Sequence, residues 1–242
     1  CLELYCTSTD RCLITDNIFI GNLSMVGTNK EGVEYAVKVL NNQFLMPTTN
    51  ESVQFAIEND FSNVEIAYNF IKNGMYPIAS FNNVEVANLN VHHNVFDKIK
   101  LPEGILLFIG WPANLKFEHN TVLYDQSIFD WRGAPTEGNS VVFIKNPVKA
   151  YLISIKKNIF YCYDGVKKNN LKLIQSPLGE VNMVPRLTID SNAFYNWMSD
   201  GSNSIEIPYK SSVFVFDGSD YKQFYGLVNK NIFSEKTFGA IY

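Results

Sequence analysis

The stretch LKFEHNTV, residues 115–122, carries the pattern that decides the fold. It reads apolar, any, apolar, any, any, Asn, any, apolar, and this word recurs along the chain of 242 residues. The eight copies are CLITDNIF (12–19), VKVLNNQF (37–44), VEIAYNFI (64–71), LNVHHNVF (89–96), LKFEHNTV (115–122), ISIKKNIF (153–160), LTIDSNAF (187–194) and GLVNKNIF (226–233). Their shared asparagines are Asn17, Asn42, Asn69, Asn94, Asn120, Asn158, Asn192 and Asn231. One structural unit is therefore repeated through the chain.

A single copy of the word predicts two short strands joined at a corner. The alternating apolar residues Leu115 and Phe117 indicate a strand with one buried face, and Val122 begins a second strand. We expect Asn120 to form the corner between them, because asparagine tolerates the left-handed backbone conformation. In stacked copies the asparagine amides would hydrogen-bond to one another as a ladder. Phenylalanine stands two residues after the asparagine in six of the eight copies, which predicts an internal aromatic column.

Repeats that cannot bury their apolar face alone predict a solenoid. With words such as NLKFEHNTV and KKNIFYCYD, the chain resembles the right-handed parallel β-helix repeat family, the pectin-lyase-like superfold. The resemblance implies an all-β fold: a single-stranded right-handed parallel β-helix of about eight coils with an internal asparagine ladder. We expect residues 1–242 to form a single domain.

Each coil needs one further strand, called the first strand here. The candidates lie at 2–6, 53–57, 77–81, 104–109, 141–145, 171–175 and 213–217, and residues 20–36 stay unassigned. The chain begins inside a coil, and an uncapped end would expose unpaired strand edges. We therefore expect missing N-terminal coils or a missing cap, or an additional domain that covers this end.

Composition narrows the class of protein. A hydrophobic share of 46% supports a large core, and a net charge of -4 argues against nucleic acid as a partner. The chain contains no run of 18 apolar residues, so the sequence predicts no membrane-spanning helix. The four cysteines, Cys1, Cys6, Cys12 and Cys162, lack the spacing of a zinc site. A Cys6–Cys12 disulfide and buried free thiols are alternatives, and Cys1 could be the lipidated first residue of a bacterial surface protein.

The resemblance implies a ligand groove along the first strands, flanked by loops that leave the third strands. The long segments 123–140, 161–170 and 195–212 would roof this groove. Acids there could transfer protons, an arginine could bind a carboxylate and a tryptophan could stack on a sugar. The candidate catalytic residues are Asp125, Asp130, Arg132 and Glu137, and the candidate substrate-binding residues are Trp131, Tyr163, Trp197 and Lys98. Alternatively, Trp131 and Trp197 pack the loops against the wall of the solenoid, and the charged side chains of the loops are solvated.

Motifs of particular enzyme branches are missing. Asn120 and Thr121 are followed by Val122 where a polygalacturonase-like pattern needs Asp, and the chain has no DD pair and no RIK. The first strands carry almost no charge, so they lack the acid cluster of a calcium-dependent pectate lyase, and their surface is suited to being covered. Lys98 or Lys100 could form with Arg132 the lysine and arginine pair of an alginate- or chondroitin-lyase-like protein, but no sequence motif identifies these residues. We expect no cofactor, with calcium left open.

Two histidines precede the asparagine in adjacent copies. His93 and His119 should stack about 5 Å apart if the coils are in register. Together with Glu118 they could bind a metal, or they could be two solvated corner residues, and His92 adds no strong ligand.

The function expected from the resemblance is interaction with an extracellular polysaccharide, by a protein secreted by, or held on the surface of, a bacterium. As an enzyme it would be a polysaccharide lyase or a glycoside hydrolase. The alternatives are a non-catalytic glycan-binding module and a structural stalk or adhesin.

Overall fold

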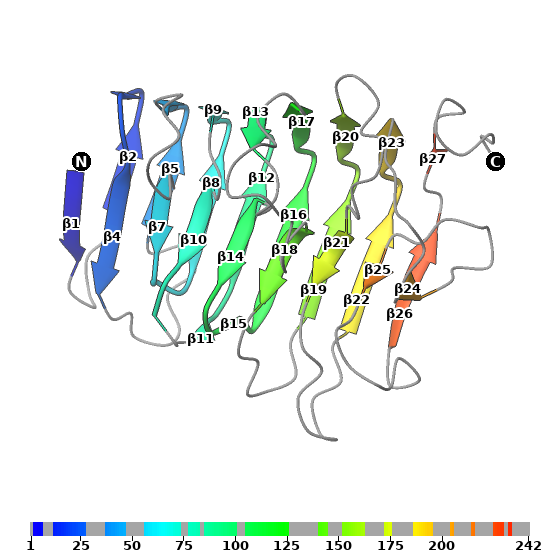
Figure 1. Cartoon of the computed structure of the whole chain (residues 1–242). Coiled ribbons are helices and arrows are strands. Elements are labelled where there is room, and N and C mark those ends of the chain that lie inside the picture. The colour runs from blue at the N-terminus through cyan, green and yellow to red at the C-terminus, as the bar shows by residue number, and fades with distance from the viewer. Residues whose placement is uncertain are drawn as a thin grey trace, which may run out of the picture.

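The structure of the protein is a computed structural model. It describes residues 2–6, 12–27, 37–46, 56–73, 77–82, 85–100, 105–125, 140–144, 152–162, 172–175, 186–195, 204–205, 214–215, 225–229 and 232–233. In Figure 1 the coils lie side by side, from the blue N-terminal strands to the red C-terminal ones. Corresponding strands of successive coils pair in parallel, so the molecule is a parallel β-helix.

Three long sheets run along the solenoid. The first-strand sheet contains β1 (Leu2–Cys6), β4 (Leu23–Gly27), β7 (Ile57–Asn59), β10 (Ile78–Ser80), β14 (Leu106–Phe108), β18 (Ser140–Ile144) and β21 (Lys172–Gln175). The second-strand sheet contains β2 (Cys12–Thr15), β5 (Val37–Leu40), β8 (Val64–Ala67), β12 (Leu89–His92), β16 (Asn114–Glu118), β19 (Leu152–Lys156), β22 (Arg186–Asp190) and β26 (Tyr225–Asn229). The third-strand sheet contains β3 (Ile18–Phe19), β6 (Gln43–Leu45), β9 (Phe70–Lys72), β13 (Val95–Lys100), β17 (Thr121–Asp125), β20 (Ile159–Cys162), β23 (Ala193–Tyr195) and β27 (Ile232–Phe233).

Two short pairs of strands complete the fold. β11 (Glu85–Val86) pairs in parallel with β15 (Trp111–Pro112), and β24 (Ser204–Ile205) pairs antiparallel with β25 (Phe214–Val215). None of the residues that the structure describes form a helix able to cross a membrane.

The eight-residue words stack in the predicted register. Leu89 pairs with Val64 and with Leu115, and Val91 pairs with Ile66 and with Phe117. These side chains are buried in one continuous core cluster, while the alternate residues face outward. The apolar positions of the word therefore form the inner face of the second-strand sheet, and the positions between them form its outer face.

The asparagine ladder is confirmed from Asn17 to Asn192. Each main-chain N–H donates to Oδ1 of the next coil's asparagine at 2.8–3.0 Å. From Asn42 onward, Nδ2 also donates to a main-chain carbonyl of the preceding coil at 2.8–2.9 Å. Asn42 to Asn192 are only 1–2% exposed, so the ladder satisfies buried polar groups along the corner. Asn231 lies outside the described residues.

The prediction that the asparagine itself is left-handed is wrong. The left-handed residue is the one immediately before it, and this corner row consists of Asp16, Asn41, Tyr68, His93, His119, Lys157 and Ser191, with φ between 54° and 60°. The chain turns at that residue, which leaves the following asparagine free to direct its amide inward. Asn94, for example, donates from Nδ2 to the carbonyl of His92, two residues earlier. The corner row therefore faces outward and tolerates many residue types.

A second, shorter asparagine stack lies where the second strands begin. Asn88 donates from Nδ2 to Oδ1 of Asn63 at 2.8 Å, and Asn114 donates to Oδ1 of Asn88 at 3.1 Å. Asn63 and Asn88 are also left-handed. This stack bends the chain into the second strand of the same coils and was not indicated by the eight-residue word.

The aromatic column is present with breaks. Phe19 stacks on Phe44 at 4.7 Å, and Phe160 stacks on Phe194 at 4.9 Å. Val122 interrupts the column, and there Phe117 of the second strand stacks instead, 5.9 Å from Phe96 and 6.4 Å from Phe160. In this coil the aromatic ring in the core therefore comes from the second strand instead of the third strand.

The first strands differ from the prediction in two places, and a further one lies in the unassigned segment. Segment 20–36 contains β4, and the strand expected at 53–57 is β7, Ile57–Asn59. The segment expected at 213–217 contains β25, which lies beside β21 as expected but pairs antiparallel with β24 rather than joining the first-strand sheet. First strands carry no asparagine to align them, and the connections before them vary in length, so their sequence position is poorly determined.

Cys12 is a free thiol packed partly buried against the core, so the Cys6–Cys12 disulfide is not formed. A short residue such as cysteine fits the inward position that Val37 occupies in the next coil.

Candidate functional site

Most of the predicted site residues lie in the long loops. Asp130, Trp131, Arg132, Glu137, Tyr163 and Trp197 lie outside the residues that the structure describes. Asp125 is the last residue of β17. Lys98 is exposed and left-handed, with φ 52°, at a shift in register between Phe96 and Ile99 of β13.

The outer face of the first-strand sheet is covered at several coils. Ser24 and Ala79 both pair with Glu58 of β7, and Ala79 pairs with Leu107, so the four share one outward row. Ser24, Ala79 and Leu107 are at most 6% exposed, although the last two are not part of the core cluster. The expected cover is present at these coils, although the row also contains Glu58, which accepts a hydrogen bond from Oγ of Ser24 at 2.6 Å.

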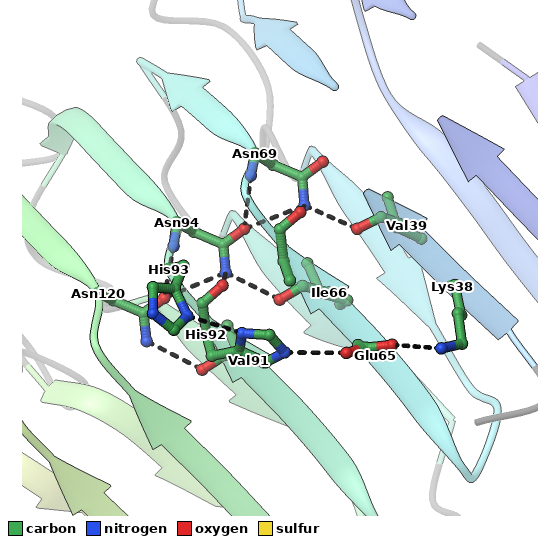
Figure 2. A network of polar contacts seen from close by, with 11 residues as sticks. Lys38, Val39, Glu65, Ile66, Asn69, Val91, His92, His93, Asn94 and Asn120 are labelled. Atoms are coloured by element: carbon green, nitrogen blue, oxygen red, sulfur yellow. Dashed lines mark hydrogen bonds and ion pairs between the residues drawn. The ribbon is translucent and has the colours of Figure 1, made fainter. Parts of the chain in front are cut away.

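The outer face of the second-strand sheet carries a chain of polar contacts across three coils, drawn in Figure 2. Nζ of Lys38 lies 2.9 Å from Oε2 of Glu65, and Oε1 of Glu65 lies 3.0 Å from Nε2 of His92. Nδ1 of His92 in turn lies 2.9 Å from Nδ1 of His93. The side chains of Glu65 and His92 are each only 16% exposed, so the centre of the chain is largely shielded from water.

When both histidines are neutral, the contacts determine which ring nitrogens carry hydrogen. An ionised Glu65 accepts only, so His92 must donate from Nε2. In a neutral His92 the other nitrogen, Nδ1, then has a lone pair and accepts. His93 must therefore donate from its Nδ1, which leaves the lone pair of His93 on Nε2. No other group among the described residues hydrogen-bonds to His93 Nε2, and His93 is exposed.

The electrostatics of the site favour an ionised Glu65 and a neutral His93. Burial alone raises the pKa of Glu65, but hydrogen bonds and charge from Lys38 and His92 outweigh it, and the net pKa lies below the ordinary value. The pKa of His93 is lowered by burial first, and then by the neighbouring charges of His92 and His119. Glu65 is therefore held ionised, and His93 stays neutral down to a lower pH than an isolated histidine does.

Three rings of the corner row stack on one another beside this chain. His93 lies 4.8 Å from His119 with an angle of 6° between the rings, which confirms the predicted histidine stack. On its other side His93 stacks on Tyr68, 5.1 Å away. His93 is thus held between two rings, and Tyr68 is itself 55% exposed.

The structure gives no support to the metal alternative at His93, His119 and Glu118. Among the described residues, no group of three or more His, Cys, Asp or Glu side chains is arranged to hold a metal ion. Oε1 of Glu118 instead accepts a hydrogen bond from Oγ of Ser154 at 2.7 Å.

This face carries two exposed lysines near the rings. Both carboxylates near the rings already have partners. Glu65 contacts Lys38 and His92, and Glu118 accepts a hydrogen bond from Ser154. Lys116, on the strand next to β12, and Lys157, beside His119 in the corner row, are both exposed. We call Tyr68, His93, His119, Lys116 and Lys157 the outer row.

Glu65, His92 and Tyr68 were not singled out by sequence motifs. The signal that could have found them is the aligned word itself. In consecutive copies, Glu65 holds the second position, His92 the fourth and Tyr68 the corner position, and all three positions face outward. Alignment predicts this neighbourhood, but it does not predict the rotamers that bring the nitrogen and oxygen atoms into contact.

Comparison of the chain with models of protein families, with curated proteins and with solved structures found no match. The β-helix assignment therefore rests on the strand register and the asparagine ladder. What the site does must be argued from its own chemistry.

Proposed function

We propose that this β-helix protein is extracellular and binds an acidic polysaccharide along the outer row. The observation that carries the proposal is the set of residues at the left-handed corner. Asp16, Asn41, Lys157 and Ser191 mark this corner in other coils, whereas three consecutive coils have Tyr68, His93 and His119. The corner row faces outward, so these three coils present a continuous stack of aromatic rings on the surface of the solenoid.

The geometry of the row suits an extended chain of repeating units. Neighbouring coils are about 4.8 Å apart, close to the advance of one sugar residue in an extended polysaccharide. Stacked rings present their edges outward, so the row offers polar nitrogen and oxygen groups at that repeat. Exposed Lys116 and Lys157 supply positive charge, which favours a polysaccharide that carries carboxylates over a neutral one.

Binding is tested by affinity electrophoresis in gels that contain a polyuronate or a neutral glucan. The protein should be retarded by the polyuronate, and retardation should weaken as salt is added. The double variant Lys116→Ala, Lys157→Ala should lower affinity about tenfold, whereas Lys72→Ala, on the third-strand sheet, should not change it. Undiminished binding by the double variant would reject the outer row. Loss of binding in Trp131→Ala or Arg132→Ala instead would locate the ligand at the loops.

Cleavage is a separate question, which incubation with a panel of uronic-acid polysaccharides addresses. Ultraviolet absorbance from unsaturated products would indicate a lyase, and new reducing ends without that absorbance would indicate a glycoside hydrolase. Each incubation is run with added calcium and with a chelator, because calcium is the cofactor left open. Binding without either product would identify a glycan-binding module.

A structural stalk or adhesin is a second candidate. It is favoured by the buried outward residues Ala79 and Leu107, since a closed first-strand face leaves no groove there. A stalk would bind none of the polysaccharides.

A further inference from the structure

We propose that Glu65, His92 and His93 form a proton-relay site, in which Nε2 of His93 acts as a general base on the O–H group of a bound molecule. The relay is a property of these three side chains. It rests on the proposed function only for the idea that a glycan lies alongside, so the two proposals can fail separately.

Every proton that moves in the relay has a donor and an acceptor among the bound O–H group, His93 and His92, so no other reagent is needed. When both histidines are neutral, an ionised Glu65 requires hydrogen on Nε2 of His92 and on Nδ1 of His93. When Nε2 of His93 takes a proton from an O–H group, the electron pair of that bond stays on the oxygen. The Nδ1 proton of His93 then passes 2.9 Å to Nδ1 of His92. His93 is neutral again, and the positive charge lies on His92, 3.0 Å from Oε1 of Glu65.

The surroundings favour this final distribution of charge. Because Glu65 and His92 are each only 16% exposed, their attraction is screened less than that of a surface pair. Lys38 stabilises the carboxylate before the proton arrives. The rings of Tyr68 and His119 fix the plane of His93, so its Nε2 keeps one direction.

The groups that can alter the titration of the relay come from both neighbouring strands and their corners. On one side they are Lys38, Glu65 and Tyr68. On the other side they are Lys116, Glu118 and His119. Both carboxylates hold hydrogen bonds, so a proton that enters at His93 has Glu65 as its nearest counter-charge.

Nuclear magnetic resonance tests the resting state directly. The chain has only three histidines, so single substitutions assign their imidazole nitrogens in a ¹⁵N-labelled sample. We expect hydrogen on Nε2 of His92 and on Nδ1 of His93 near neutral pH. Hydrogen on Nε2 of neutral His93 would overturn the relay.

The chemical test uses p-nitrophenyl acetate, an activated ester, as the probe. An oxygen that loses its proton to His93 attacks the carbonyl carbon, the ester C–O bond breaks and p-nitrophenolate leaves. Free acetate would show that the O–H group belongs to water, and an acetylated glycan would show that it belongs to a sugar. Either product at a rate above that of His93→Gly supports the site.

Glycine suits the left-handed His93 position, at φ 54°, so His93→Gly should fold and lose at least tenfold in rate. Added imidazole should restore part of that rate, after the hydrolysis that imidazole causes without protein is subtracted. The control Ser191→Gly, at another corner with φ 56°, should keep the wild-type rate and gain nothing from imidazole beyond that background. Equal rates for wild type and His93→Gly would refute the proposal, even if polyuronate binding holds. A normal relay in protein that binds no glycan would instead refute only the proposed function.

Discussion

Replacing Asn94 with alanine removes a buried amide from the middle of the ladder, and its cost follows from what each partner loses. Oδ1 of Asn94 accepts from the main-chain N–H and from Nδ2 of Asn69. Nδ2 of Asn94 donates to the carbonyls of Ile66 and His92 and to Oδ1 of Asn120. Five hydrogen bonds disappear from a side chain that is 1% exposed.

Most of these partners keep another contact. The carbonyl of His92 still accepts from the N–H of Tyr68, and Nδ2 of Asn69 still donates to two carbonyls. Oδ1 of Asn120 still accepts from the main-chain N–H of Asn94. The main-chain N–H of Asn69 has no replacement for its acceptor, and an unpaired buried donor costs about 1–3 kcal/mol. With lost packing, we expect Asn94→Ala to lower the free energy of unfolding by about 2–4 kcal/mol.

The assay is urea denaturation followed by circular dichroism, with Asn17→Ala as the matched control. Asn17 holds the same position in the word and is exposed, and no described residue donates to its Oδ1, so its loss should cost under about 1 kcal/mol. Equal losses in the two variants, or a loss below about 1 kcal/mol for Asn94→Ala, would refute the ladder as a source of stability.

Three further expectations concern pH, the core and the corner. The pKa of His93 is lower in the folded protein than its unfolded value of about 6.5, so the unfolded chain binds more protons between these two pKa values. The melting temperature should therefore fall as the pH drops below about 6.5. His93→Gln should make the melting temperature depend less on pH in this range. Phe160→Ala, at a ring stacked on Phe194 in the core, should cost about 3–5 kcal/mol, whereas Ile159→Ala, at an outward side chain that is 50% exposed, should cost under about 0.5 kcal/mol. Ser191→Val should cost about 1–2 kcal/mol, because a β-branched residue is strained at φ 56°, while Ser191→Gly should be neutral or stabilising; equal stability of the two variants would contradict a left-handed corner.

The second and third strands could be predicted because each word contains its own positional marker. Alternating residues such as Leu115 and Phe117 specify the buried face, and Asn120 aligns each coil with the next through its amide. First strands contain no such marker, so the sequence does not predict β4, and β7 begins later in the chain than predicted. The corner conformation was assigned one residue late, because His93, Lys157 and Ser191 share a backbone angle but no chemistry.

The candidate site could be predicted less well. The register foresees the stack of His93 and His119, since a fixed coil repeat places equivalent residues beside each other. It does not foresee the contact from Glu65 to His92, which crosses between different positions of the word and depends on two rotamers. The loop candidates around Trp131 depend on tertiary contacts that a repeat pattern does not encode, and they stay predictions.

The most direct test of the proposed function is a crystal structure of the protein with a bound acidic oligosaccharide. We predict an extended sugar chain across β8, β12 and β16 along the outer row, with a carboxylate near Lys157 and a hydroxyl or a water within hydrogen-bonding distance of Nε2 of His93. A sugar chain bound elsewhere on the molecule, or a crystal saturated with oligosaccharide that shows no bound sugar, would contradict it.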